Sequence, residues 1–199
     1  MVRRTYILLA LLWALALLFL GYMYFSGHFT LFLNSVKNPD TGKARSFVLA
    51  SSAFENGESI PAEYTCDAKQ ISPPLTINDT PAGTKSFVLV MEDRDVPKNL
   101  KPDGVFLHWL VFDIPADTKD IGTAEIVGVQ GQSGNGVAGY VGPCPPSQYN
   151  PPEHRYYFDL YALDTTLGLS EGATMETVRA AMQNRMIAHT TLMGRYLRQ

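Results

Sequence analysis

An uncharged apolar run near the start of the chain constrains the fold most. Residues 6–25 contain no charged side chain, and the run ends in Tyr22, Tyr24 and Phe25. As a helix of about 20 residues it would be about 30 Å long, which matches the hydrocarbon thickness of a bilayer. It has no polar face with which to lie on a soluble domain. We therefore expect residues 1–25 to form one N-terminal transmembrane helix that anchors the protein.

Charges flanking this run predict its orientation. Arg3 and Arg4 precede it, and the next cation is Lys37, so the positive-inside rule keeps the N-terminus in the cytoplasm. A cleaved secretory signal is the alternative, but its apolar part should be shorter and should end in an Ala-x-Ala-like site. Both interpretations place the rest of the chain outside the cytoplasm, and we favour the uncleaved single-pass anchor. Residues 26–45 are then a spacer.

The remaining residues, 46–199, are enough for one domain with a single core. Ten Phe and ten Tyr beside 13 Pro and 16 Gly favour short strands joined by turns. A net charge of −3 provides no basic surface for nucleic acid. Two cysteines are too few for a disulfide scaffold or a four-thiolate zinc site.

Hydrophobic alternation predicts a mainly β domain. The expected strands are 46–54, 85–92, 105–114, 154–163 and, in preference to a helix, 187–197. Residues 174–182 are expected to be a helix, with Thr174 as its N-cap.

Three of these strands carry ionisable groups where alternation predicts a core-facing side chain. These groups are Asp93 and Asp95 after the second strand, His108 in the third, and His154 with Tyr156 in the fourth. Alternation assigns His108 to the same face as Phe106, Leu110 and Phe112. A surface turn would also explain the two aspartates, and a hydrogen-bonded core residue would explain His108.

A Gly/Pro-rich loop, residues 139–146, runs toward His154, and such a loop can turn backbone N–H groups toward an anion. Burying the ionisable groups singly would be costly. We therefore hypothesise that they line one pocket with this loop. Two imidazoles, a phenol and backbone N–H groups would suit a phosphate or a carboxylate, and the aspartates would orient the histidines.

Two other kinds of site are weaker alternatives. Two His and two Asp could hold zinc or iron, but no His-x-x-x-His pair is present, so we expect no metal and no other cofactor. A hydrolase would use His108 or His154 as its base. No serine lies on a recognisable nucleophile turn, so we expect a binding protein and not an enzyme.

Five motifs, in order and spacing, resemble the phosphatidylethanolamine-binding protein family in its prokaryotic Raf-kinase-inhibitor-like branch. They span residues 66–75, 93–97, 108–115, 139–146 and 154–156. The resemblance implies a sandwich of two antiparallel sheets with a few peripheral helices. It also implies a pocket for phosphate-type head groups lined by Asp93, His108, Tyr140, Gly142, Pro145, His154 and Tyr156. Cys66 and Cys144 lie in two of the motifs, so a disulfide between them is implied, with two buried free thiols as the alternative.

Three departures from the family pattern are visible, one of which is Ala68 where a glycine is usual. Arg94 stands where the family usually has proline, and residues 147–153 form a longer insert than usual before His154. The expected function is a membrane-tethered binding protein for an anionic small ligand, such as a phospholipid head group. The alternative is an extracytoplasmic inhibitor that docks on a protease or kinase through the insert and the pocket rim.

Overall fold

We describe the protein from a computed structural model, which defines Leu17 and residues 47–198. The predicted anchor and spacer lie outside these residues, apart from Leu17. Within the described part of the chain, no helix has the length and apolar character needed to span a bilayer. The residues from Ser46 to Gln199 form a compact unit of their own.

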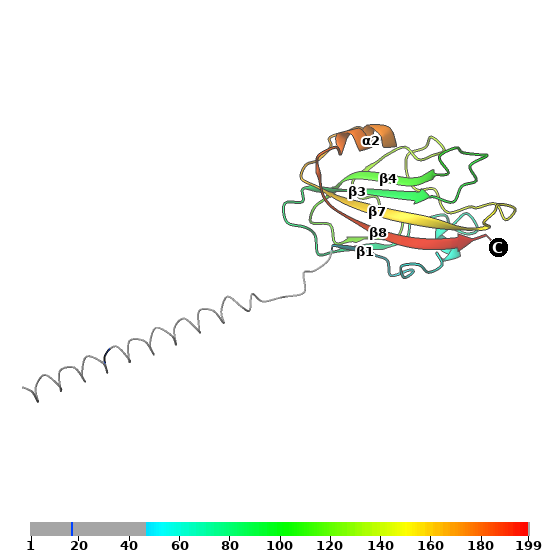
Figure 1. Ribbon diagram of the computed structural model, residues 1–199, viewed down its shortest axis with the longest axis horizontal. Helices are drawn as coiled ribbons and strands as arrows, with labels where there is room; N and C mark the ends of the chain where they lie inside the picture. The colour runs from blue at the N-terminus through cyan, green and yellow to red at the C-terminus, as the bar shows by residue number, and fades with distance from the viewer. Residues whose placement is uncertain (1–16, 18–46, 199) are drawn as a thin grey trace, which may run out of the picture. The chain divides into compact units, whose positions relative to one another are not determined.

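This unit contains two antiparallel β-sheets, as predicted (Figure 1). The larger sheet has five strands in the order β6-β4-β3-β7-β8, and the smaller has three in the order β1-β2-β5. The elements are β1 (Val48–Ala50), η1 (Ala62–Tyr64), β2 (Leu75–Asn78), β3 (Ser86–Asp93), β4 (Phe106–Pro115), β5 (Asp120–Ile121), β6 (Val129–Gln130), β7 (Glu153–Leu163), α2 (Met175–Ala181) and β8 (Met186–Leu197).

The five-stranded sheet is covered on both faces, which explains why its central strand β3 is buried almost throughout. Alternate residues of β3 face opposite layers. Phe87, Leu89 and Met91 pack with the small sheet in the main core. Val88 and Val90 pack against α2 in a second cluster. The main core therefore lies between the sheets, with the helix on the outer face of the larger one.

Local sequence signals explain α2 and β8. The Thr174 side chain accepts a hydrogen bond from the backbone N–H of Thr177, which caps the first turn of the helix. Val178 is fully buried against the sheet. The predicted final strand is present as β8, paired along its length with β7. The predicted first strand is shorter than expected, because only Val48–Ala50 pairs with β2.

The face predicted for His108 was wrong, and a β-bulge is the reason. Met91 pairs with Trp109, but the next residue, Glu92, pairs with Leu107, so His108 is an extra residue in β4. Strict alternation fails at that point. Leu110 and Phe112 face α2, whereas His108 packs edge-on against Tyr156 of the main core, with ring centroids 5.1 Å apart.

Candidate functional site

The ends of three adjacent strands bring the candidate residues together. Asp93 is the last residue of β3 and lies in register with Phe106 of β4 and Tyr156 of β7. His154 lies two residues before Tyr156, and side chains two apart on a strand share a face. The predicted face of β7 is therefore correct, because His154, Tyr156 and Phe158 all point to the inner layer.

Asp93 and His154 form a buried pair. The Nδ1 atom of His154 lies 2.6 Å from Oδ2 of Asp93, and the two side chains are 1% and 6% exposed. The other carboxylate oxygen of Asp93 accepts a hydrogen bond from the backbone N–H of Asp95 at 2.8 Å. An ionised carboxylate only accepts, so Nδ1 of His154 donates and its Nε2 is the nitrogen left for another partner.

His108 is held by the backbone of the Gly/Pro-rich loop. Its Nδ1 atom lies 2.7 Å from the carbonyl oxygen of Val141, and the N–H of Val141 donates to the carbonyl of His108 at 2.8 Å. Burial lowers the pKa of His108, although the hydrogen bond to Val141 and the charge of Asp93 act in the opposite direction. The ring is therefore neutral at neutral pH.

Two polar atoms at this site are buried without a hydrogen-bond partner among the described residues. They are Nε2 of His154 and the hydroxyl of Tyr156. Burial, reinforced by the nearby charge of Asp93, raises the pKa of Tyr156 far above its ordinary value, so its phenol stays protonated. A buried polar atom without a partner is costly, which makes these two atoms natural contacts for a ligand.

A disulfide fixes the 139–146 loop, which contributes residues to the site. Cys66 and Cys144 are bonded across 78 residues of sequence, and the N–H of Cys66 donates to the carbonyl of Pro143 at 3.1 Å. A Cβ atom on Gly142 would lie 2.9 Å from the carbonyl oxygen of Tyr64. Glycine is therefore needed there so that the loop can pack closely against the segment that carries Cys66.

These groups enclose a cavity of about 290 Å³. Histidines and a buried acid form its polar end, and aromatic, valine and proline side chains form much of the rest. Its lining residues are Asp93, Val96, Phe106, His108, Val141, Gly142, Cys144, Pro145, Pro146, Tyr149, His154 and Tyr156. Six of the eight predicted ligand-binding residues are among them.

The other two predicted residues, Asp95 and Tyr140, do not line this cavity. The hydrogen bond from Asp95 N–H to Asp93 turns the chain after β3, so alternation does not continue to Asp95. Asp95 instead pairs with Arg155 at 2.6 Å, and this hydrogen-bonded pairing lowers the pKa of Asp95. Tyr140 packs against Trp109 and donates its hydroxyl to the carbonyl of Tyr64 at 2.7 Å.

Sequence reasoning missed two aromatic residues at the cavity. Phe106 was predicted to share a face with His108 but not to line the cavity, and its ring lies edge-on to His108. Tyr149 belongs to the insert, and its ring stacks on His154 with centroids 6.1 Å apart. The position of the insert beside a histidine motif was the available signal for Tyr149. The unusual Arg94 points elsewhere, with its guanidinium on Glu92, Asp159 and the ring of Tyr157.

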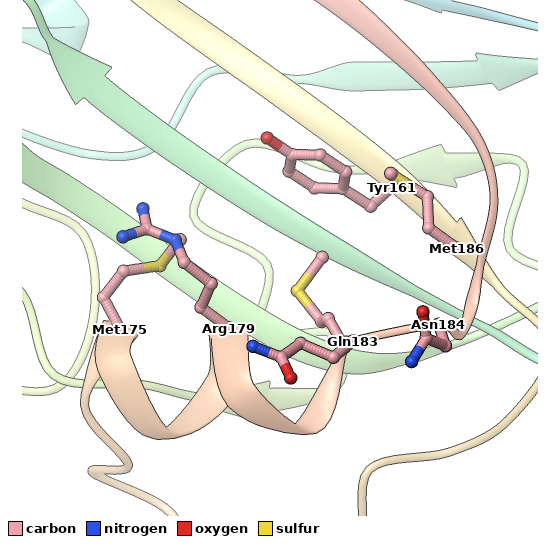
Figure 2. Close-up of a pocket in the computed structure, with 7 residues that line it drawn as sticks. Tyr161, Met175, Arg179, Gln183, Asn184 and Met186 are labelled. Atoms are coloured by element: carbon pink, nitrogen blue, oxygen red, sulfur yellow. The ribbon is translucent and has the colours of Figure 1, made fainter.

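A second cavity, of about 400 Å³, lies between α2 and strands β7 and β8 (Figure 2). Figure 2 shows Met175, Arg179 and Gln183 on the helix side and Tyr161 on the sheet side. Among the residues that the structure describes, no histidine and no carboxylate lines it. It therefore lacks the paired acid and imidazole of the first cavity.

In the described part of the chain, no three His, Cys, Asp or Glu side chains come together as a metal site.

The fold and cavity define a class: a two-sheet β-protein with a small histidine-lined ligand pocket at the end of its larger sheet. The family model for phosphatidylethanolamine-binding protein matches residues 50–197. The chain belongs to the phosphatidylethanolamine-binding protein family, as the sequence motifs predicted.

Known relatives support this assignment, and the similarity extends over nearly the whole length of each relative. The UPF0098 protein of Chlamydia trachomatis is 43% identical over 149 residues, which are 74% of this chain and 97% of that protein. A crystal structure of a phosphatidylethanolamine-binding protein homologue from C. trachomatis has a TM-score of 0.72 at 41% identity and covers 76% of this chain and 97% of its own. The structure of Escherichia coli YbcL has a TM-score of 0.68 at 26% identity and covers 77% and 99%.

Proposed function

We propose that the cavity beside Asp93 and His154 binds a small anionic ligand through a phosphate or carboxylate group. The observation that carries the proposal is the pair of buried, partnerless atoms, His154 Nε2 and the Tyr156 hydroxyl. Tyr156 can donate as a neutral phenol. His154 is oriented by the Asp93 carboxylate at its Nδ1, so its Nε2 is the nitrogen left to contact a ligand.

The lining also indicates what kind of molecule carries the anionic group. No lysine or arginine is among the lining residues that the structure describes, so hydrogen bonds, and not a lysine or arginine side chain, would hold the anionic group of the ligand. Apolar side chains such as Val96, Phe106 and Pro146 offer contacts for an organic substituent. A phospholipid head group or another small phosphate-bearing molecule fits this combination of a polar end and an apolar wall.

We propose binding and not catalysis as the role of this site. Among the described lining residues the only hydroxyls are the phenols of Tyr149 and Tyr156, and the sulfur of Cys144 is joined to Cys66 in the disulfide. The raised pKa of Tyr156 makes its phenolate, the nucleophilic form, scarce at neutral pH. The geometry therefore supplies hydrogen bonds to a guest and offers no activated nucleophile.

Titration calorimetry with inorganic phosphate tests the proposal. Tyr156→Phe removes one partnerless hydroxyl and retains the ring, so we expect phosphate affinity to fall about tenfold while the protein stays folded. Tyr161→Phe is the matched control, because Tyr161 lies on the same strand but outside this cavity. The proposal fails if phosphate does not bind, or if Tyr156→Phe binds it as well as the wild type.

We further propose that the N-terminal segment tethers this domain to a membrane, with the domain on the extracytoplasmic side. The uncharged run at residues 6–25 and the two preceding arginines support this location. In a bacterial host, the full chain with a C-terminal tag should sediment with membranes, and protease added to intact spheroplasts should remove the tag. A tag protected until the cells are lysed would contradict this orientation.

A further inference from the structure

A third cavity, of about 320 Å³, adjoins the same loop as the cavity that is proposed to bind an anion. Gly139 and Tyr140, at the start of the 139–146 loop, line this third cavity, whereas Val141, Gly142 and Cys144 line the first. Among the described residues the two cavities share no lining residue. The third cavity can therefore hold a ligand of its own.

The side chain of Gln130, in this third cavity, is fixed with a hydrogen-bond donor unused. Its amide oxygen accepts a hydrogen bond from the indole Nε1–H of Trp109 at 2.8 Å. An indole nitrogen can only donate, so the amide nitrogen of Gln130 must be the end that points away from the indole. That nitrogen is buried and has no hydrogen-bond partner among the described residues. A buried donor without a partner is costly, so a ligand oxygen in this cavity would stabilise it.

The surrounding structure holds this donor in place. Gln130 ends the short strand β6 and lies in register with Val111 of β4. Its carbonyl accepts a hydrogen bond from the N–H of Gly172 at 2.9 Å. Trp109 is only 2% exposed and packs edge-on against Tyr140, with ring centroids 5.5 Å apart. The donor and the two rings are therefore preorganised, which lowers the ordering cost of binding.

The charges at this cavity suit a cation. Glu125 and Glu171 line it, and no lysine, arginine or histidine is among the lining residues that the structure describes. The carboxylate of Glu125 accepts a hydrogen bond from the N–H of Gly122 at 2.6 Å, which fixes its position. Ile126 is 77% exposed and adds apolar surface to the lining. Two carboxylates beside aromatic and apolar side chains favour a positively charged group on an apolar molecule.

We propose that this third cavity is a second ligand site, which binds a small organic ammonium compound. The ammonium group faces the carboxylates of Glu125 and Glu171. An oxygen atom of the same molecule accepts a hydrogen bond from Nε2 of Gln130, and its apolar part packs against Trp109 and Tyr140. The inference goes beyond the proposed function, because phosphate binding in the first cavity could fail while this site still holds its ligand.

Calorimetric titration of the full chain with three related compounds tests the inference. Phenylalanine amide carries an ammonium group, a carbonyl oxygen and an apolar ring, and at pH 6 its amine is protonated. Phenethylamine lacks the carboxamide and should bind about tenfold more weakly. Phenylpropionamide lacks the ammonium group and should bind about fivefold more weakly. Failure of phenylalanine amide to bind, or an equal affinity for either analogue, would overturn the inference.

Two variants then assign the contacts to this cavity. Glu171→Gln removes one exposed carboxylate, so the affinity for phenylalanine amide should fall about threefold, while that for phenylpropionamide stays unchanged. Gln130→Met removes the donor, so phenylalanine amide and phenethylamine should then bind with equal affinity. Glu58→Gln is the matched control, since Glu58 is also exposed but lies outside this cavity. Wild-type binding by Glu171→Gln, or by a folded Gln130→Met protein, would contradict the assignment. If Gln130→Met does not fold, the three wild-type titrations and Glu171→Gln still decide between the outcomes.

Discussion

At the scale of single residues, the two neighbouring aspartates have different surroundings. Asp93 is 4% exposed and orients His154 from within the cavity wall. Asp95 lies one residue beyond Arg94 and faces Arg155, whose side chain is half exposed. The contribution of Asp95 to the site is its backbone N–H, which does not depend on its side chain.

Substitution of the two aspartates should therefore have different effects on ligand binding. Asp93→Asn removes the carboxylate that holds Nδ1 of His154 and orients its ring in the cavity, so we expect phosphate affinity to fall about tenfold, the size expected for losing a hydrogen bond to a charged group. Asp95→Asn should leave affinity nearly unchanged. Calorimetry on both variants checks this, and a larger loss in Asp95→Asn than in Asp93→Asn would contradict the arrangement.

His108 should make stability depend on pH in a defined window. Burial lowers its pKa from the ordinary value of 6.5. Below that pH the unfolded chain takes up a proton that folded His108 does not, so the free energy of unfolding decreases as pH falls from about 6.5 toward the folded-state pKa. Above 6.5 this group has no such effect.

Denaturant unfolding at pH 7.5 and pH 5.5 measures that dependence. His108→Phe should lose less stability between the two pH values than the wild type, whatever its absolute stability. The same loss in His108→Phe and in the wild type would show that His108 is not the buried neutral base described above.

At the scale of elements, the site depends on two local irregularities. The β-bulge in β4 turns His108 toward Tyr156, and the disulfide secures the 139–146 loop that bonds His108. Regular strands alone would place His108 on the α2 side of the sheet, away from Asp93.

Removal of the disulfide should weaken both the fold and the site. It closes a loop across 78 residues of sequence, and for a loop of that length the double variant Cys66→Ser/Cys144→Ser should lose about 4 kcal/mol of stability. Phosphate binding should weaken too, because Cys144 lines the cavity. Urea unfolding compares the variant with oxidised and reduced wild type, and an unchanged midpoint in the variant would contradict this expectation.

At the scale of the whole molecule, periodicity predicted four of the five strands of the larger sheet, with the exception of the two-residue β6, and the inner face of β7, because side chains alternate wherever a strand is regular. It failed at His108 and Asp95, where a bulge and a hydrogen-bonded turn break the alternation. Tyr140 could not be placed because loop side chains follow no period, and here Val141 bonds His108 while Tyr140 turns toward Tyr64. The family motifs identified the fold and most of the cavity but gave no geometry.

The most direct test of the central claim is nitrogen NMR of the histidine side chains during a phosphate titration. We expect saturable shifts of Nε2 in both His154 and His108, with no comparable change at His189, which lies outside the cavity. Absence of any shift at His154 and His108, or a response at His189 alone, would contradict the claim that this cavity binds a phosphate group.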